Sequence, residues 1–423
     1  MSDLLIKNVM LPDGGQGGVW VRDGRIAALG ADAERAATPD APALDGAGAV
    51  VLPGAIDMHV HFRTPGGEHK ETLLTGARAA AKGGVTTCAD MPNTNPRTTT
   101  MQALREKMAL AEGAASNLLY NFGAEPGNLE EVRQAAADDR VRALKIYMGP
   151  STGQGGLAPD AVEAHFRQAA EIGLPVMVHA EDLERINHND ALHPHDAHHH
   201  HMLRDKEGEL QAIGQAIGWA KKYGVQLYLA HVTLPGAVPM AEESGIRDQI
   251  YIEVCPHHLV LAVEEIAAPL ENRYKVNPPL RERAERDALF AMLCEGRLDG
   301  IGSDHAPHTL AEKDAPYDSA PSGIPGVEYL FPMAITWWLQ GRFDQTRLVD
   351  VTSANASRYF KLNKGAVAVG RDADLVLVQP DARWEIGRGD DRVWSKCGWT
   401  LYEGMPMQGA ITHTLVMGRV AHP

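Results

Sequence analysis

Two histidines with a spacing of two end the apolar run "AIDMHVH" at residues 55–61, and an arginine follows at position 63. Because alternate residues of a strand face the same side, His59 and His61 would point the same way and could bind one metal ion. Arg63 continues the series and could bind a carboxylate through two parallel hydrogen bonds. The alternative is that Arg63 faces solvent or pairs with Glu68. This stretch indicates a metal site with an anion-binding group beside it.

Further potential ligands fall at the ends of other strand candidates, namely Lys145, His179, His231 and Asp304. A lone buried histidine is usually a core residue, but four histidines and an aspartate at strand ends suit zinc or a similar divalent ion. Lys145 cannot ligate a metal as an ammonium, which has no lone pair. It either extends its charged end to solvent or forms a carbamate with carbon dioxide, which would place two oxygens between two metals. Spacing alone leaves both interpretations open.

Short β-branched runs alternate with stretches of helical length from residue 55 onward. The strand candidates are 55–61, 85–91, 118–124, 142–148, 174–180, 226–232, 250–256 and 299–305. Helix candidates such as 70–82 and 158–172 are each followed by glycine, a common helix stop. Eight strand–helix units predict an α/β fold of the (β/α)8 TIM-like barrel type, in which reactive residues lie at the C-terminal ends of the strands.

The two ends of the chain do not follow this alternation. Residues 1–54 and the tail from 365 consist of short apolar runs separated by glycine turns. We expect both ends to pair into one small β-sandwich module beside the barrel. The module would comprise residues 1–54 and 365–423, and the metal-dependent catalytic barrel would comprise residues 55–364.

The composition is that of a globular protein, with 44% hydrophobic residues and a net charge of −15. That charge argues against a general nucleic-acid or anionic-membrane binder. No apolar run approaches the roughly 20 residues that span a bilayer, and the N-terminus does not resemble a signal peptide. The four cysteines, Cys88, Cys255, Cys294 and Cys397, lack CxxC spacing, which favours reduced thiols. We expect a cytoplasmic protein without nucleic-acid or membrane partners.

The chain contains, in this order, the motifs "DMHVHFRTPGGEHKETLLTGARAAAKGGVTTCADMPNTNP", "LKIYMG", "VMVHAED", "LAHVT", "EVCPHHL", "YKVNPPLR", "GSDHAPHTLAEK" and "SGIPGVE". Together these motifs closely resemble those of the dihydroorotases of the amidohydrolase superfamily. The tail "GAVAVGRDADLVLV" is similar to the C-terminal β-module of that superfamily. The resemblance implies that His59, His61 and Asp304 bind one metal, that His179 and His231 bind a second, and that carboxylated Lys145 bridges them.

Many bacterial members carry an Asp-Asp-Gly run after the fourth strand and use an aspartate as the bridge. This chain has "KIYMGPSTG" there, a departure that favours the lysine carbamate. The resemblance further implies two divalent ions, with zinc expected, and a small-molecule substrate. It places Arg63, Asn93 and His308 around the substrate carboxylate and Asn277 on the pyrimidine ring.

The implied reaction is the reversible hydrolysis of the cyclic amide of L-dihydroorotate to N-carbamoyl-L-aspartate in de novo pyrimidine synthesis. Two metals would activate a shared water, and Asp304 would act as the general base and then the general acid. Related allantoinases and hydantoinases are an alternative, although they typically lack the "MPNT" and "NPPLR" pair. A second alternative is an inactive scaffold that assembles with aspartate transcarbamoylase, against which the filled ligand positions argue. A homodimer and an active complex with that partner both stay open.

Three segments have no firm role from the sequence. The glycine-rich loop 149–156 could close over the barrel mouth and bring Ser151 or Thr152 to the substrate, or it could be a plain connection. The histidine-rich stretch 193–201 shows no link to the catalytic metals. We expect His257 and His258 to support the ligands or to pack in the core.

Overall fold

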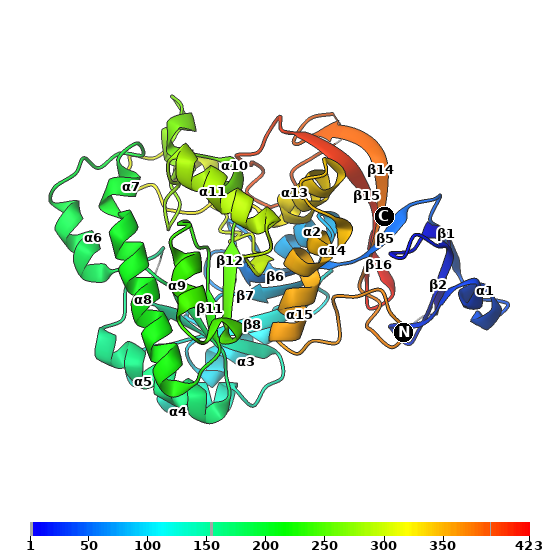
Figure 1. Cartoon of the computed structure of the whole chain (residues 1–423), viewed down its shortest axis with the longest axis horizontal. Helices are drawn as coiled ribbons and strands as arrows, with labels where there is room; N and C mark the ends of the chain where they lie inside the picture. The colour runs from blue at the N-terminus through cyan, green and yellow to red at the C-terminus, as the bar shows by residue number, and fades with distance from the viewer. Residues whose placement is uncertain (1–2, 153–154, 390) are drawn as a thin grey trace.

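The computed structural model describes residues 3–152, 155–389 and 391–423. One sheet holds eight parallel strands in the order β13-β12-β11-β10-β9-β8-β7-β6. These strands are β6 (Ala55–Val60), β7 (Val85–Asp90), β8 (Asn117–Gly123), β9 (Val141–Tyr147), β10 (Val176–His179), β11 (Leu227–Leu229), β12 (Ile250–Val254) and β13 (Gly300–Ile301). A parallel bridge between Val60 and His305 brings the two edges together. The predicted (β/α)8 barrel is confirmed (Figure 1).

Helices surround the barrel and connect its strands. They are α2 (Leu73–Lys82), α3 (Met101–Ala109), α4 (Leu129–Ala135), α5 (Pro159–Ile172), α6 (Leu183–Asp190), α7 (His200–Leu203), α8 (Lys206–Tyr223), α9 (Ala237–Glu243), α10 (Pro256–Val260), α11 (Arg283–Cys294), α12 (Leu310–Lys313), α13 (Val327–Leu339), α14 (Gln345–Val349) and α15 (Asn355–Tyr359). The two helices predicted in detail are confirmed. The side chain of Thr72 caps the start of α2, and Gly173 with φ 68° ends α5, a backbone conformation that glycine adopts without a steric penalty.

All eight predicted strands run past the ends of the observed strands, and at three of them a left-handed residue follows the observed end. β6 ends at Val60, β11 at Leu229 and β13 at Ile301. Shortly after each end a residue adopts a left-handed backbone, namely Arg63 (φ 61°), His231 (φ 40°) and Asp304 (φ 43°). Such conformations are unfavourable for residues other than glycine, and they concentrate at functional sites. Strand alternation therefore does not extend to Arg63, contrary to the prediction.

Apolar residues pack on both faces of the barrel sheet. The larger cluster lies between the strands and the helices and includes Leu144, Ile146, Val176 and Val178. A second cluster draws residues from seven consecutive barrel strands, including Ile56, Ala89, Leu119, Ala143, Met177, Tyr228 and Tyr251, which places it inside the barrel. On β9, Ala143 and Lys145 share a face, so Lys145 lies above this inner core.

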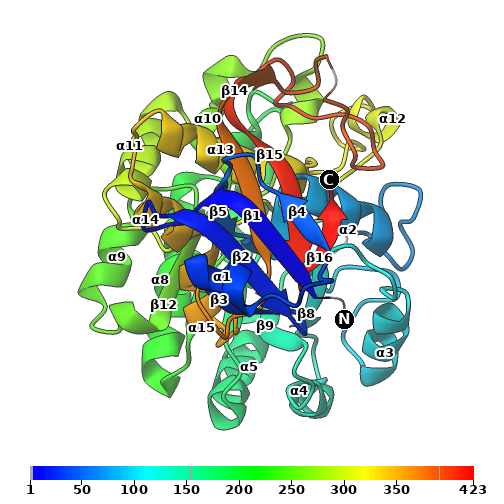
Figure 2. The same cartoon turned by 90° about the vertical axis from the view of Figure 1, so that its right-hand side faces the viewer.

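The two ends of the chain form a β-module beside the barrel, as predicted (Figure 2). Its strands are β1 (Leu4–Met10), β2 (Gln16–Arg22), β3 (Arg25–Gly30), β4 (Ala43–Asp45), β5 (Val50–Pro53), β14 (Leu375–Glu385), β15 (Pro406–Val416) and β16 (Arg419–His422), with α1 (Ala31–Ala36) between β3 and β4. β14 pairs antiparallel with β5, with Leu375 opposite Pro53. The boundaries of the two domains stay a prediction. In the described part of the chain, no helix is long and apolar enough to cross a membrane.

Candidate metal centre and active site

The six predicted metal ligands converge at the C-terminal ends of the barrel strands. Asp304 Oδ1 lies 3.0 Å from His61 Nε2 and 3.4 Å from His59 Nε2. His59, His231 and Asp304 bring potential ligand atoms within 4.8 Å of one another. His179 Nδ1 lies 2.9 Å from His231 Nε2. Because these side chains come from strands spread over the whole barrel, only the closed sheet brings them together.

Burial and charge set the protonation of this cluster. Burial lowers the pKa of His61 to about 4, and burial also lowers the pKa of His179. Burial favours the neutral acid of Asp304, but His59 and His61 outweigh it and hold the pKa of this carboxyl well below its usual range. His61 and His179 are thus neutral and Asp304 is ionised, which are the forms that bind metal.

Lys145 is fully buried, and its Nζ has no hydrogen-bond partner among the described residues. Burial lowers the pKa of Lys145 to about 8, against the opposing effect of Asp304 and Glu253. An unpartnered ammonium is costly in such surroundings. At pH 7–8 a substantial share of the Lys145 side chains is therefore the neutral amine. The neutral amine is the form that reacts with carbon dioxide, so the site fits a lysine carbamate.

Two buried glutamates orient the histidines. Glu253 Oε1 accepts hydrogen bonds from His59 Nδ1 and from the backbone N–H of His231, both at 2.8 Å. Glu181 Oε2 accepts a hydrogen bond of 2.6 Å from His179 Nε2 and pairs with Arg204. Each carboxylate fixes a proton on one ring nitrogen, leaving a lone pair on the other, as is usual for metal-binding histidines. Sequence analysis missed both glutamates, although an acidic residue inside the apolar run "IYIEV" was a signal.

Arg63 and His308 lie together beside this cluster. The guanidinium of Arg63 is buried, donates from Nε to the carbonyl of Pro307 at 3.1 Å, and lies 3.0 Å from His308 Nε2. Lys70 Nζ donates to His308 Nδ1 at 3.0 Å. Burial, together with Arg63 and Lys70, holds the pKa of His308 well below its usual range. The neutral imidazole leaves the charge of Arg63 available to an anion.

Asn93 and Asn277 both line the small cavity above Asp304, but each also forms a hydrogen bond within the chain. Asn93 Oδ1 accepts a 2.6 Å hydrogen bond from His61 Nδ1, and Asn93 Nδ2 donates to the carbonyl of Thr152. Asn277 Oδ1 accepts a 2.9 Å hydrogen bond from His200 Nε2. His200 belongs to the histidine-rich stretch, so that stretch has a structural link to the site that sequence analysis missed.

The cavity above Asp304 is small, about 20 Å³, and His61, Arg63, Asn93, Thr152 and Asn277 are among the residues that line it. This volume holds about one water molecule. The side chain of Thr152 donates to the carbonyl of Ser322 at 2.8 Å and separates this space from neighbouring cavities of about 430 and 360 Å³. A larger cavity of about 620 Å³ lies elsewhere, between α13 and the β14–β15 pair. Residues 153 and 154 of the predicted loop lie outside the described residues.

Comparison with known families identifies this arrangement. The model of the amidohydrolase family matches residues 50–421. The chain belongs to the amidohydrolase family. It is therefore a hydrolase of a family that typically binds divalent metals, and the buried donor set around Asp304 fits such ions.

The similar sequences are named dihydroorotases, whereas the similar solved structure is named a hydantoinase. A dihydroorotase from Halobacterium salinarum is 41% identical over 392 residues, which cover 90% of each chain. A dihydroorotase from Anaeromyxobacter dehalogenans is 35% identical over 436 aligned positions, covering 100% of this chain and 98% of the relative. Among solved structures, the L-hydantoinase (dihydropyrimidinase) from Arthrobacter aurescens has a TM-score of 0.90 at 28% identity, covering 99% of this chain and 96% of its own.

Proposed function

We propose that this amidohydrolase is a dihydroorotase, which reversibly hydrolyses the ring amide of L-dihydroorotate to N-carbamoyl-L-aspartate. The observation that carries the proposal is the buried guanidinium of Arg63, which lines the cavity above Asp304 and lies against neutral His308. A buried guanidinium binds a carboxylate strongly, and dihydroorotate carries a carboxylate that hydantoin and allantoin lack. The names of the relatives at 35–41% identity support the same substrate.

The proposed metal ligands divide into two groups. His59, His61 and Asp304 would hold one divalent ion, His179 and His231 would hold the other, and the carbamate of Lys145 would lie between them. Zinc is the expected ion, because neutral imidazoles and carboxylates suit it. When bound, two such ions lower the pKa of a shared water and polarise the amide carbonyl.

The residues of the chain would perform the remaining steps. Asp304, ionised and within 3.0 Å of His61, would accept the proton of the attacking water and pass it to the departing amide nitrogen. Arg63 and His308 would hold the substrate carboxylate, with Asn93 beside them and Asn277 on the ring. Thr152 lines the small cavity above Asp304 and both neighbouring cavities, so its withdrawal from Ser322 would admit the substrate and its return would exclude bulk water.

A hydantoinase-type activity on neutral rings is the second candidate. The TM-scores of 0.90 and 0.88 to L-hydantoinase and to the dihydropyrimidinase from Brevibacillus agri favour it, at identities of 28% and 27%. The match to the Brevibacillus agri structure covers 99% of this chain and 94% of that chain. The two candidates differ in what they require of Arg63, because a neutral ring gains nothing from a buried guanidinium.

The test compares ring opening of L-dihydroorotate, hydantoin and allantoin by the wild type and by Arg63→Ala. For dihydroorotate we expect KM to rise on the order of 100-fold, because a charge-assisted hydrogen-bonded pair is lost, while the metal content per chain is unchanged. Arg140→Ala, which removes a surface arginine paired with Asp138, is the control and should match the wild type. Preference of the wild type for hydantoin would replace the proposal with the second candidate.

A further inference from the structure

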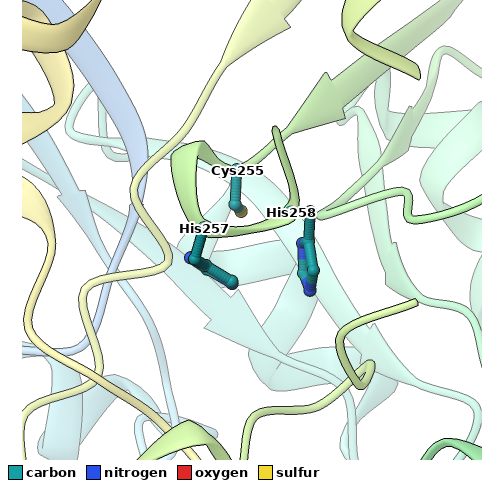
Figure 3. A group of neighbouring side chains, drawn as sticks. All are labelled: Cys255, His257 and His258. Carbon is teal, nitrogen blue, oxygen red and sulfur yellow. The ribbon is translucent and has the colours of Figure 1, made fainter. Parts of the chain in front are cut away.

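A second group of potential metal ligands lies where β12 runs into α10. Cys255, His257 and His258 bring ligand atoms within 4.8 Å of one another, and all three residues are buried. Figure 3 shows their side chains gathered around one turn of the backbone. The ring centroids of His257 and His258 are 4.1 Å apart. None of the six ligands proposed for the amidohydrolase centre belongs to this group.

His257 is unusual for a core histidine. It is 1% exposed, and neither of its ring nitrogens has a hydrogen-bond partner among the described residues. A neutral imidazole carries one N–H donor and one lone pair, and leaving such groups buried without partners is unfavourable. A bound cation would use the lone pair and remove part of this cost.

The hydrogen bond of His258 prepares it for the same role. Its Nε2 donates to the carbonyl of Pro278 at 3.1 Å, while Nδ1 has no partner among the described residues. The proton is thereby fixed on Nε2, and Nδ1 keeps a free lone pair. A backbone carbonyl that fixes the tautomer is the usual outer contact of a metal-binding histidine.

We propose that Cys255, His257 and His258 form an additional site for a thiophilic divalent cation of the zinc class. Thiolate sulfur and neutral imidazole nitrogen are both zinc ligands, and the fourth tetrahedral position would be left to water. Binding would release the thiol proton of Cys255 to solvent. Because His258 contacts Pro278, the ion would fasten the turn after β12 to the segment that carries Asn277.

Two carboxylates lie within electrostatic reach of this place. Burial lowers the pKa of His257 to about 4, which keeps the imidazole neutral; His59 acts in the same direction, and Asp304 and Glu253 act against it. The cluster directly follows the strand that carries Glu253, which also orients His59. An ion bound to Cys255 would thus lie near the main centre but would be held by different atoms.

Cobalt(II) substitution tests the site without an activity assay, so its result is independent of the proposed function. The metal-free protein is loaded with Co²⁺, and its near-ultraviolet spectrum is recorded. A thiolate-to-cobalt charge-transfer band is expected in the wild type, since the proposed amidohydrolase ligands contain no sulfur. Cys255→Ser should abolish the band, and the variant should bind one zinc ion fewer per chain than the wild type. His257→Gln should weaken zinc binding at the site at least tenfold.

Cys294→Ser is the matched control, because Cys294 is also a free thiol but lies on α11, and it should keep the band. Circular dichroism confirms that each variant is folded. Absence of the band from cobalt-loaded wild type would overturn the proposal without reference to any variant. A band that disappears in Cys255→Ser but is unchanged in both His257→Gln and His258→Gln would also overturn it, since the thiolate would then bind an ion with other partners.

Discussion

At the scale of single residues, Glu253 has the most connected side chain beneath the metal centre. Its carboxylate accepts hydrogen bonds from His59 Nδ1, from the backbone of His231 and from the hydroxyl of Tyr228. It is fully buried. The negative charge stabilises the Nδ1 proton of His59 and makes Nε2 a stronger ligand.

Glu253→Gln should therefore weaken metal binding by about ten- to a hundredfold while the fold is retained, because the amide is nearly isosteric. Equilibration against a series of buffered free-zinc concentrations, followed by metal analysis, measures the change. Glu242→Gln is the control, since Glu242 is an exposed partner of Arg297 and should leave the affinity at the wild-type value. Equal affinities in all three proteins would remove Glu253 from a supporting role.

The side chains that gather at the candidate metal centre could be picked out from the sequence because their signals are local. An HxH pair, and histidines or an aspartate directly after apolar runs, stand out along the chain. Their partners could not be predicted in the same way. Glu253 meets His59 across 194 positions, and His200 meets Asn277 across 77 positions. Such contacts depend on strand order and on side-chain directions that only the closed barrel fixes.

At the scale of elements, the segment after β14 reaches from the β-module back to the active site. Trp399, on this segment, donates from Nε1 to the carbonyl of His308 at 2.7 Å and is buried. We expect Trp399→Phe to raise KM for dihydroorotate several-fold, because His308 loses an anchor while most of the apolar contact remains. The lost hydrogen bond should cost about 1 kcal/mol of stability.

Trp384→Phe provides the matched control for this prediction. Trp384 donates from Nε1 to the carbonyl of Gly409 at 2.9 Å, within the β14–β15 pair. The same kind of bond is lost at a distance from His308, so stability should fall by a similar amount while KM is unchanged. Steady-state kinetics and urea unfolding of both variants measure the two effects. A rise in KM in both variants would attribute the effect to general destabilisation.

The short helix α12 has a cap that depends on pH. Glu312 accepts hydrogen bonds from the backbone N–H and the hydroxyl of Thr309, and it pairs with Lys70 at 2.9 Å. Burial favours the neutral acid, but Lys70 and Thr309 outweigh it and lower the pKa of Glu312 to about 2. Because the folded pKa lies below the unfolded value of about 4.3, the carboxylate stabilises the fold above pH 4.3, and this contribution is lost as the pH falls toward 2.

Glu312→Gln should consequently lower the free energy of unfolding by about 1–2 kcal/mol at pH 7, after allowance for solvent screening of a side chain that is 31% exposed. The difference from the wild type should shrink as the pH falls below about 4.3. Urea unfolding at a series of pH values measures it. A difference that is the same at pH 7 and pH 3 would show that the charge of Glu312 contributes nothing.

At the scale of the whole molecule, the alternation of strands and helices was enough to predict the barrel, and the glycine-rich ends predicted the module. The strand ends were predicted less well. β13 has only two residues, Gly300 and Ile301. The backbone then turns away from the strand direction, and Asp304 faces His59 and His61. The sequence of the segment that carries Trp399 has no periodic pattern that would predict its path, because its contacts with the barrel come from single side chains.

Removal of metal should show whether the fold depends on the proposed metal site. The apolar clusters on both faces of the barrel sheet contain none of the six ligands, so the chelated protein should keep the far-ultraviolet circular dichroism of the native form. The ligands span residues 59 to 304 and come together only in the folded barrel, so bound ions should stabilise that state by mass action. At a free ion concentration about 1,000-fold above Kd this amounts to about 4 kcal/mol per site. We expect chelation to lower Tm by roughly 5–10 °C and zinc to restore it. A chelated chain that is unfolded at 25 °C would instead show that the metals are needed to form the barrel.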